Sequence, residues 1–251
     1  MKIDNKLKLP KKSLGQNFLK DKNIIKKIIK SIDINNQNII EVGPGTGVLT
    51  EKILLNKPKN LIVIEKDDQL AKNLLEKFNN QKIEVINEDV LNYDFTIFKN
   101  YKILSNLPYN ISSKFLVKTL KLMPHINEIC CMIQSELALK FDYKKGKMNK
   151  YKFVSEYFSN YEILFDVSPN VFFPKPKVNS KIVKFKLKKR KINNEVFDSF
   201  IRSFFLNRRK KIRSNKLLKK FIHPQEGDKR YEDLNYLDVL TIYKRFNLFF
   251  S

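Results

Sequence analysis

Tryptophan is absent from this chain of 251 residues, and glycine, histidine and cysteine are scarce. The two histidines, His125 and His223, are isolated, so no metal-ligand spacing can be built from them. The two cysteines, Cys130 and Cys131, are adjacent in an apolar run that is typical of a buried strand, and one vicinal pair excludes a disulfide framework. We therefore expect packing roles for both cysteines and no metal centre.

Acidic residues are also few in comparison with basic ones. The chain has 50 Lys and Arg against 26 Asp and Glu, a formal net charge of +24. A biased genome can enrich lysine, but such a bias would not by itself remove Asp and Glu. The imbalance favours a polyanionic partner, either nucleic acid or an anionic membrane surface. No apolar run of about 18 residues and no signal segment occurs, so a soluble cytoplasmic protein is expected.

Three of the six glycines, Gly43, Gly45 and Gly47, fall within five residues. A short apolar run, 39–42, precedes them, and residues 48–55 follow with apolar positions at helical spacing. Strand, glycine turn and helix form the geometry of a nucleotide-binding crossover, in which glycine lets a ligand approach the main chain. The spacing is G-x-G-x-G, whereas a dinucleotide fingerprint is G-x-G-x-x-G.

Acidic residues stand at or near the ends of three consecutive predicted strands. Glu41 precedes the glycines, and a carboxylate there would repel a pyrophosphate but suit a cationic ligand such as S-adenosylmethionine. Glu65 ends the strand 61–64 and is placed to accept hydrogen bonds from two ribose hydroxyls. Asp89 follows the strand 82–86 and could accept a hydrogen bond from an adenine amino group. Together they predict a nucleoside pocket at the carboxyl ends of a parallel sheet.

A fourth strand, 102–105, runs into Asn106-Leu107-Pro108-Tyr109. Asn106 presents both a carbonyl acceptor and an amide donor, Pro108 makes the backbone rigid, and Tyr109 offers a face for a planar base. The position beside the nucleoside pocket favours a substrate site over a simple turn.

The C-terminal part of the chain predicts a second, smaller unit. A double-proline loop at 174–176 can hold Phe172 or Phe173 toward the pocket, or staple the core. The strand 181–187 alternates apolar and basic residues, as expected of a sheet edge with one wet face. A basic linker and a helix with an apolar face then lead to the basic stretch 207–213. We expect one domain over 1–187, with a basic N-terminal arm, and a helical RNA-binding domain over 188–251.

Seven stretches of the chain, in order, resemble the KsgA-type ribosomal RNA adenine dimethyltransferase family over nearly the full length. They are Leu14-Gly15-Gln16-Asn17-Phe18-Leu19, Glu41 to Gly47, Glu65, Glu88-Asp89-Val90, Asn106 to Ser112, Phe172 to Ser180 and Asn207 to Arg213. The resemblance implies an α/β, Rossmann-like class I S-adenosylmethionine-dependent methyltransferase fold with a small helical C-terminal domain. It departs at Lys150-Tyr151-Lys152, where the family usually has Tyr-Gly-Arg.

The resemblance implies the cofactor-binding residues, and the residue patterns described above add the transfer, stacking and RNA-binding residues. Those expected to bind S-adenosylmethionine are Asn17, Leu19, Gly43, Gly45, Glu65, Asp89, Val90 and Asn106. Those expected to carry the transfer are Asn106, Leu107, Pro108 and Tyr109, with Tyr109 and Phe172 stacking on a flipped adenosine. Those expected to bind RNA are Arg208, Arg209, Lys210, Lys211 and Arg213. No metal is expected.

The substrate implied is a pair of adjacent adenosines in a hairpin loop near the 3′ end of small-subunit ribosomal RNA, each methylated twice at N6. The expected partner is then the immature small subunit. The protein is expected to act as a monomer and not to bind a membrane. An Erm-type enzyme acting on large-subunit (23S) RNA shares the glycine turn and the N-x-P-Y turn. A small-subunit assembly factor acting mainly by binding is another reading, and a mitochondrial transcription-factor relative is disfavoured because no transit peptide is evident. The stretch 207–213 and the continuation Asn110-Ile111-Ser112 favour the small-subunit enzymes.

Overall fold

The computed structural model describes residues 16–206 and 210–250. The basic N-terminal arm and the residues Asn207, Arg208 and Arg209 of the basic stretch lie outside the described residues. Within them, seven strands form one sheet in the order β4-β3-β2-β5-β6-β9-β7. The strands are β2 (Asn38–Val42), β3 (Asn60–Glu65), β4 (Glu84–Asn87), β5 (Tyr101–Asn106), β6 (Ile126–Gln134), β7 (Ser159–Val167) and β9 (Ser180–Leu187). A separate two-residue ladder pairs β1 (Phe18–Leu19) with β8 (Phe172–Phe173).

Strands β2 to β6 are parallel, and β9 and β7 are antiparallel additions beside β6. From β2 the chain builds outward to β3 and β4, then returns to β5 on the other side of β2. This reversal of strand order is the switch point at which open α/β sheets bind ligands, outside the carboxyl ends of the strands. The predicted α/β, Rossmann-like class is confirmed.

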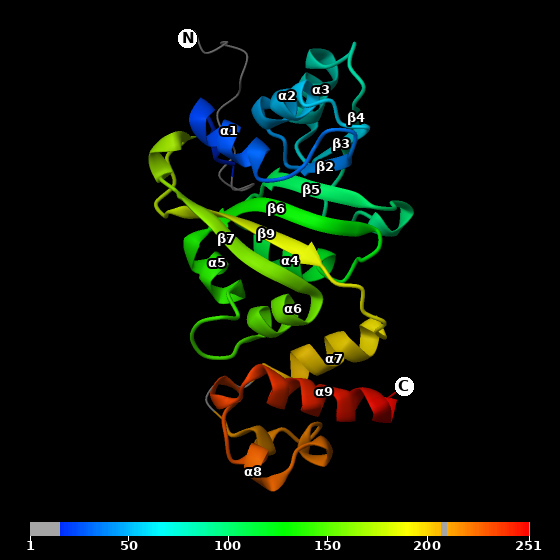
Figure 1. The fold of residues 1–251 in the computed structure, drawn as a ribbon, viewed down its shortest axis with the longest axis vertical. Coiled ribbons are helices and arrows are strands. Elements are labelled where there is room, and N and C mark those ends of the chain that lie inside the picture. The colour runs from blue at the N-terminus through cyan, green and yellow to red at the C-terminus, as the bar shows by residue number, and fades with distance from the viewer. Residues whose placement is uncertain (1–15, 207–209, 251) are drawn as a thin grey trace.

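Helices cover both faces of the sheet (Figure 1). The helices are α1 (Lys22–Lys30), α2 (Val48–Leu55), α3 (Asp68–Lys77), α4 (Ser112–Thr119), α5 (Ser135–Phe141), α6 (Lys150–Phe158), α7 (Asn194–Phe204), α8 (Pro224–Gly227) and α9 (Tyr236–Phe250). Alternation along the strands divides the core, since Ile39 packs with α1 and α2 whereas its neighbour Ile40 joins the cluster of α4 to α6. The buried run Ile129–Ile133 explains both cysteines as packing residues, with Cys130 and Cys131 on opposite faces.

The predicted role of residues 181–187 as an edge strand is wrong. Strand β9 lies between β6 and β7, and the edge is β7. Lys184 and Lys186 share one face of this interior strand, where Lys184 lies 3.5 Å from Glu128 of β6. Lys181 lies on the opposite face, at the start of the strand, and pairs with Asp166 of β7. Alternation of apolar and basic residues indicates that one face of a strand is exposed to solvent. Interior strands of an antiparallel sheet can also have such a face.

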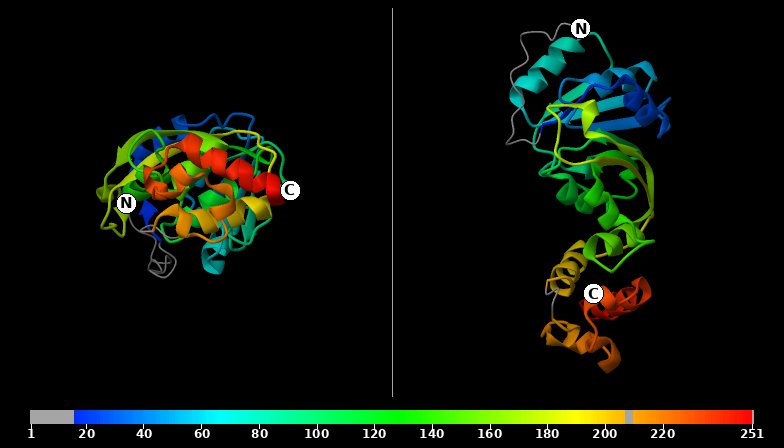
Figure 2. Two further views of the ribbon diagram at one scale, coloured as in Figure 1. Left: turned by 90° about the horizontal axis from the view of Figure 1, so that it is seen from below. Right: turned by 90° about the vertical axis from the view of Figure 1, so that its left-hand side faces the viewer.

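The helices beyond Leu187 form a lobe at one end of the molecule (Figures 1 and 2). Strand β9 ends at Leu187, and the division into two domains at this point stays a prediction. The spacing of apolar residues predicts the apolar face of α7. On this face the centroid of the Phe197 ring lies 5.0 Å from that of Phe158 and 5.3 Å from that of Tyr243 of α9. The same hydrophobic cluster thus continues from α6 into the lobe. Because this core is shared, we expect the lobe to be held firmly against the sheet domain.

Candidate functional site

A cavity opens at the carboxyl ends of β2, β3, β4 and β5. Its lining includes every residue that the sequence analysis assigned to cofactor binding: Asn17, Leu19, Gly43, Gly45, Glu65, Asp89, Val90 and Asn106. The four residues assigned to the transfer, Asn106, Leu107, Pro108 and Tyr109, line the same cavity. The fold therefore brings together residues that come from five separate stretches of the sequence.

The glycine turn forms the floor of this cavity. Gly43, Gly45 and Gly47 all have positive φ, at 63°, 59° and 74°. A Cβ on Gly45 would lie 2.9 Å from the Phe18 ring, and one on Gly43 would lie 3.2 Å from the Pro108 ring. Larger residues are therefore excluded both by backbone conformation and by space. The turn packs against the N-terminal segment on one side and the Asn106–Tyr109 turn on the other.

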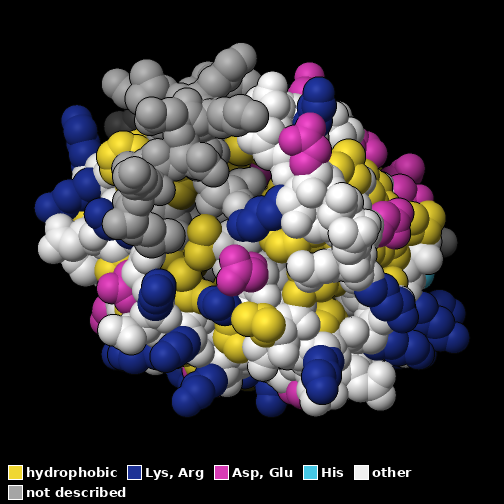
Figure 3. All heavy atoms as spheres, turned by 90° about the horizontal axis from the view of Figure 1, so that it is seen from above, with side chains coloured by type: hydrophobic (Ala, Val, Ile, Leu, Met, Phe, Trp, Pro, Cys, Tyr) yellow, Lys and Arg dark blue, Asp and Glu magenta, His cyan; other side chains and the backbone are white. Residues whose placement is uncertain are grey.

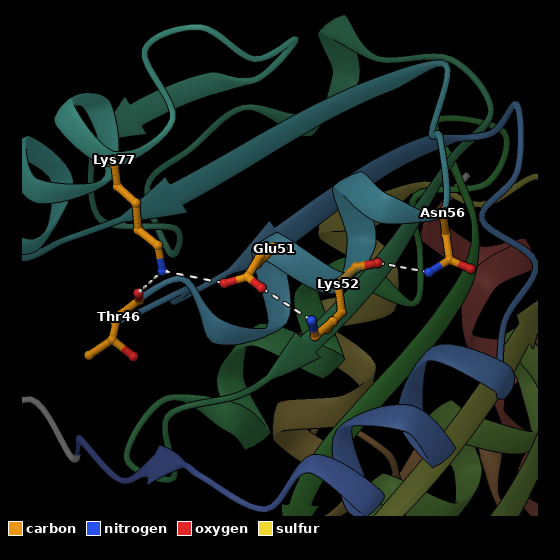
Figure 4. A network of polar contacts seen from close by, with 5 residues as sticks. All are labelled: Thr46, Glu51, Lys52, Asn56 and Lys77. Carbon is orange, nitrogen blue, oxygen red and sulfur yellow. Dashed lines mark hydrogen bonds and ion pairs between the residues drawn. The ribbon is translucent and has the colours of Figure 1, made fainter. Parts of the chain in front are cut away.

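Helix α3 supports the outer side of the turn, as Figure 4 shows. Lys77 Nζ donates a hydrogen bond to the Thr46 carbonyl oxygen at 3.2 Å and lies 3.9 Å from a Glu51 oxygen. Glu51 also pairs with Lys52 at 3.1 Å. These groups are exposed, so each pair adds little stability, and their contribution is to tie α2, α3 and the turn together.

Glu65 is buried at the end of β3 and both of its carboxylate oxygens accept backbone hydrogen bonds. Oε2 accepts from the Gly45 amide at 3.1 Å, and Oε1 accepts from the Asp67 amide at 2.9 Å. Burial raises the pKa of this carboxyl, and the two amides oppose that rise. Each carboxylate oxygen keeps a further lone pair, so the geometry fits the predicted contact with two ribose hydroxyls.

Glu41 lines the cavity but is only 2% exposed, and Thr50 Oγ1 donates a hydrogen bond to its Oε2 at 2.6 Å. Burial, with a smaller contribution from the Glu65 charge, raises its pKa to about 8. The sequence interpretation assumed an ionised carboxylate at this position. A pKa near 8 favours the protonated form of Glu41 at neutral pH, because the carboxyl is buried and Thr50 is the donor that contacts it.

The raised pKa of Glu41 predicts a pH-dependent stability. The unfolded chain releases this proton near pH 4.5, and the folded chain holds it to about pH 8, so the folded state binds more protons between those values. Stability contributed by this group is therefore lost as pH rises. Between about pH 6 and about pH 8.5 its share of the unfolding free energy should fall by about 2 to 3 kcal/mol. Urea unfolding of the ligand-free protein should show this fall, and Glu41→Gln should remove it, because glutamine does not titrate.

The matched control for that experiment is Glu76→Gln, since Glu76 is exposed on α3. Its pH profile should follow the parent protein. Parallel profiles for the parent and Glu41→Gln would contradict the protonated state assigned to Glu41.

Asp89 is held in position by two donors. Lys66 Nζ lies 2.8 Å from Oδ2, and the Leu91 amide donates to Oδ1 at 3.0 Å. The hydrogen bond from Lys66 lowers the pKa of Asp89. An ionised carboxylate beside Val90 can accept a hydrogen bond from an amino group, as predicted. The sequence analysis did not identify Lys66, although its position directly after Glu65 places it at the same strand end.

The Asn106–Tyr109 turn is anchored to segments distant in the sequence. Asn106 Nδ2 donates to the Asn17 carbonyl oxygen at 3.0 Å. The Tyr109 hydroxyl lies 2.6 Å from Ser180 Oγ, and Ser180 is fully buried at the start of β9. These contacts fix the amide of Asn106 and the ring of Tyr109 within the cavity wall. In the sequence Ser180 is only the last residue of a matching stretch, because a partner 71 residues away leaves no local signal.

The stacking role predicted for Phe172 is not supported by its position. Its ring is 2% exposed and belongs to the core cluster with Leu19 and Ile28. Phe173 is 53% exposed instead. Neighbouring side chains on a strand point to opposite sides, and β8 turns Phe172 inward. An open aromatic face at this segment belongs to Phe173.

The predicted RNA-binding residues fall into two groups. Arg208 and Arg209 lie outside the described residues. Lys210, Lys211 and Arg213 are exposed, and both Lys211 and Arg213 contact Asp228, at 3.1 and 2.8 Å. Their roles in RNA binding stay a prediction.

The stretch Lys150-Tyr151-Lys152, where the sequence departs from the family pattern, begins α6. Lys152 is only 4% exposed, and burial lowers its pKa. In this position it packs inside the protein and is not presented to a phosphate.

Within the described part of the chain, no helix has the length and apolarity that a bilayer crossing requires. The same residues contain no group of three or more His, Cys, Asp and Glu side chains placed to hold a metal ion.

Comparison with known sequences gives matches over nearly the whole chain. A family model described as ribosomal RNA adenine dimethylase matches residues 8–248. The protein named ribosomal RNA small subunit methyltransferase A from Mesomycoplasma hyopneumoniae (strain 232) is 36% identical over 255 residues, covering 97% of each chain. The protein of the same name from Malacoplasma penetrans is 41% identical over 212 residues, covering 81% of this chain and 76% of the relative.

Solved structures give the same fold. A dimethyladenosine transferase from Plasmodium falciparum superposes with a TM-score of 0.75 at 25% identity, covering 92% of this chain and 97% of the other. The 23S rRNA methyltransferase ErmE superposes with a TM-score of 0.70 at 23% identity, covering 91% of this chain and 99% of the other. The second likeness is one of fold alone.

Proposed function

The chain belongs to the ribosomal RNA adenine dimethylase family, and from that premise we propose that it dimethylates N6 of two adjacent adenosines in the 3′-terminal hairpin loop of small-subunit (16S) ribosomal RNA. As a member of this family it is an enzyme that uses S-adenosylmethionine as methyl donor. The observation that carries the proposal is the single cavity in which the glycine turn and the Asn106–Tyr109 turn meet. The names of the relatives that cover most of the chain support the choice of the small subunit.

The cavity fits S-adenosylmethionine. When bound, this molecule supplies a methyl group made electrophilic by a positively charged sulfur. Glu65 would hold the ribose, Asp89 and Val90 the adenine, and the glycine turn the remaining main-chain contacts. The excluded Cβ positions on Gly43 and Gly45 show how closely the walls approach this turn.

The Asn106–Tyr109 turn would orient the target base. The Tyr109 ring is held by Ser180, so it can offer a fixed face to an adenine turned out of its loop. Stacking is worth about 1 to 3 kcal/mol per base, which is on the scale of the unstacking cost of a few kcal/mol. Pro108 keeps this face in place, because its ring packs where a Cβ of residue 43 would be.

Asn106 and the Leu107 carbonyl would prepare the nucleophile. The N6 lone pair of adenine is delocalised into the ring and is a poor nucleophile. Asn106 uses its amide nitrogen on the Asn17 carbonyl, which leaves Oδ1 as its acceptor for an N6 proton. Two acceptors, Asn106 Oδ1 and the Leu107 carbonyl oxygen, would favour a pyramidal nitrogen with its lone pair directed at the methyl group. Positioning then supplies most of the acceleration, and no dedicated general base is needed.

The high positive charge suits an RNA substrate. Figure 3 shows Lys and Arg side chains around much of the rim of the face opposite the C-terminal lobe. We further propose that the protein acts as a monomer in the cytoplasm on the immature small subunit. A role mainly in subunit assembly would predict that binding, and not methylation, is the activity that cells require.

To test the substrate, the purified protein is incubated with labelled methyl donor and immature small subunits. A separate reaction contains large subunits instead. Dimethyladenosine should appear in small-subunit RNA, at adjacent positions located by mass spectrometry of the digested RNA. Label found only in large-subunit RNA would contradict the proposal and favour the Erm-type reading.

A further inference from the structure

Two phenylalanines share one side of the small ladder between β1 and β8. The register places Phe18 opposite Phe173 and Leu19 opposite Phe172. Leu19 and Phe172 face the core, at 7% and 2% exposure. Since side chains alternate along a strand, Phe18 and Phe173 lie together on the other side. Directly opposed residues have Cβ atoms about 4.5 to 5.5 Å apart, so the two side chains leave the ladder from neighbouring positions.

This aromatic side borders the cavity through Phe18. Phe18 lines the cavity, and its ring occupies the space where a Cβ of Gly45 would lie. The Lys20 amide donates to the Val171 carbonyl oxygen at 2.9 Å, which extends the pairing beyond the two ladder residues. Phe173 is therefore held by backbone hydrogen bonds beside the cavity, yet about half of its surface is exposed to water.

The loop after Phe173 carries exposed positive charge, and hydrogen bonds hold its far end in place. Lys175 and Lys177 are both exposed, and no acidic residue occurs between 167 and 194. The loop ends where the Asn179 carbonyl oxygen accepts from the Ser135 amide at 2.9 Å and Ser180 contacts the Tyr109 hydroxyl. The loop thus connects the exposed ring directly to the wall that would hold the target base.

We propose that Phe173 is a stacking platform for the RNA base that neighbours the adenosine in the cavity, and that Lys175 and Lys177 contact the adjoining phosphates. An exposed aromatic ring beside cations is the combination that binds single-stranded nucleic acid. Tyr109 would stack on the base in the cavity. The Phe173 ring lies outside the cavity and is therefore placed to stack on the next nucleotide of the strand. This inference rests on the proposed RNA substrate and adds to it a residue outside the set assigned above.

The test measures RNA binding by Phe173→Ala, Phe173→Tyr and the control Leu139→Ala. Leu139 is a comparably exposed apolar side chain on α5, at 54%. Phe173→Ala should weaken binding of the substrate RNA about 10-fold to 100-fold and raise KM for RNA similarly, with the affinity for S-adenosylmethionine unchanged. Phe173→Tyr should restore binding, since it keeps the ring. Leu139→Ala should bind as the parent does.

The phosphate contacts are tested by salt dependence. The double variant Lys175→Gln with Lys177→Gln should reduce the slope of log Kd against log salt by about 1 to 2. Lys59→Gln with Lys99→Gln is the control, because both lysines are exposed on other segments. Parent-like RNA binding by Phe173→Ala, or equal loss in the alanine and tyrosine variants, would overturn the stacking role. An unchanged slope in the double variant would overturn the phosphate contacts.

The two proposals fail separately. If the parent methylates large-subunit RNA only, the proposed substrate is wrong, and the same variants are then measured on the RNA that is accepted. If the parent methylates small-subunit RNA but Phe173→Ala binds it normally, only the stacking platform is wrong.

Discussion

Replacing Asn106 with alanine should reduce methyl transfer at least about 1,000-fold while leaving RNA binding within about threefold of the parent. The Asn106 side chain would accept a hydrogen bond from N6 as the lone pair of N6 localises. Removing this acceptor should therefore slow the methyl-transfer step and leave RNA binding nearly unchanged. Removing one preorganised hydrogen-bonding group from an active site costs about 100-fold to 1,000-fold, and misplacing the reacting atoms adds to this. Single-turnover methylation with saturating RNA and donor measures the rate, and filter binding measures RNA affinity.

Two further variants isolate the cause. Asn106→Asp keeps the shape but replaces the donor to the Asn17 carbonyl with an oxygen, so the carboxylate is repelled from its anchor and activity should also fall. Asn80→Ala, at an exposed position after α3, should be as active as the parent. Transfer by Asn106→Ala at a rate near that of the parent would show that the role given to Asn106 is wrong.

Replacing Glu65 with alanine should weaken S-adenosylmethionine binding at least about 100-fold. Each hydrogen bond between a hydroxyl and a carboxylate contributes about 1.5 to 3 kcal/mol to the binding free energy, and two such bonds would be removed. A tenfold change in affinity corresponds to about 1.4 kcal/mol. The same change also removes the acceptor of the Gly45 amide, which loosens the turn that forms the floor of the cavity. Isothermal titration calorimetry with the donor measures the effect.

Glu65→Gln should fall between the parent and Glu65→Ala, since one side-chain oxygen remains to accept hydrogen bonds. Glu76→Ala is the control for the loss of an acidic residue on the same half of the sheet. Thermal melting of each variant separates loss of the site from loss of the fold. Parent-like affinity in a folded Glu65→Ala protein would exclude Glu65 from the donor site.

Much of the site could be predicted because its parts are local. Helix α1 begins directly after Asp21, whose side chain accepts hydrogen bonds from the Asn23 and Ile24 amides, as a local capping rule requires. The glycine spacing predicted the turn after β2, and the residues at the strand ends predicted the wall of the cavity. Each of these signals depends on a few neighbouring residues and on a rule about where parallel strands end.

Other features needed the assembled chain. The choice between Phe172 and Phe173 depends on which side of β8 meets the core, and both rings fit the sequence equally well. The protonation of Glu41 depends on burial beneath α2 and on Thr50, which a strand-end pattern does not report. The interior place of β9 depends on pairing with β7, which alternation along one strand cannot reveal.

The amino-acid sequence by itself determined four strands of the parallel sheet, the glycine turn and the acidic and amide side chains at the strand ends, because periodicity and turn conformation act over a few residues. Only the tertiary structure decided which ring is exposed, which carboxyl keeps its proton and which partners hold Asn106 and Tyr109. Those properties arise from desolvation and from hydrogen bonds between residues 71 and 89 positions apart, and they exist only when the sheet brings the segments together.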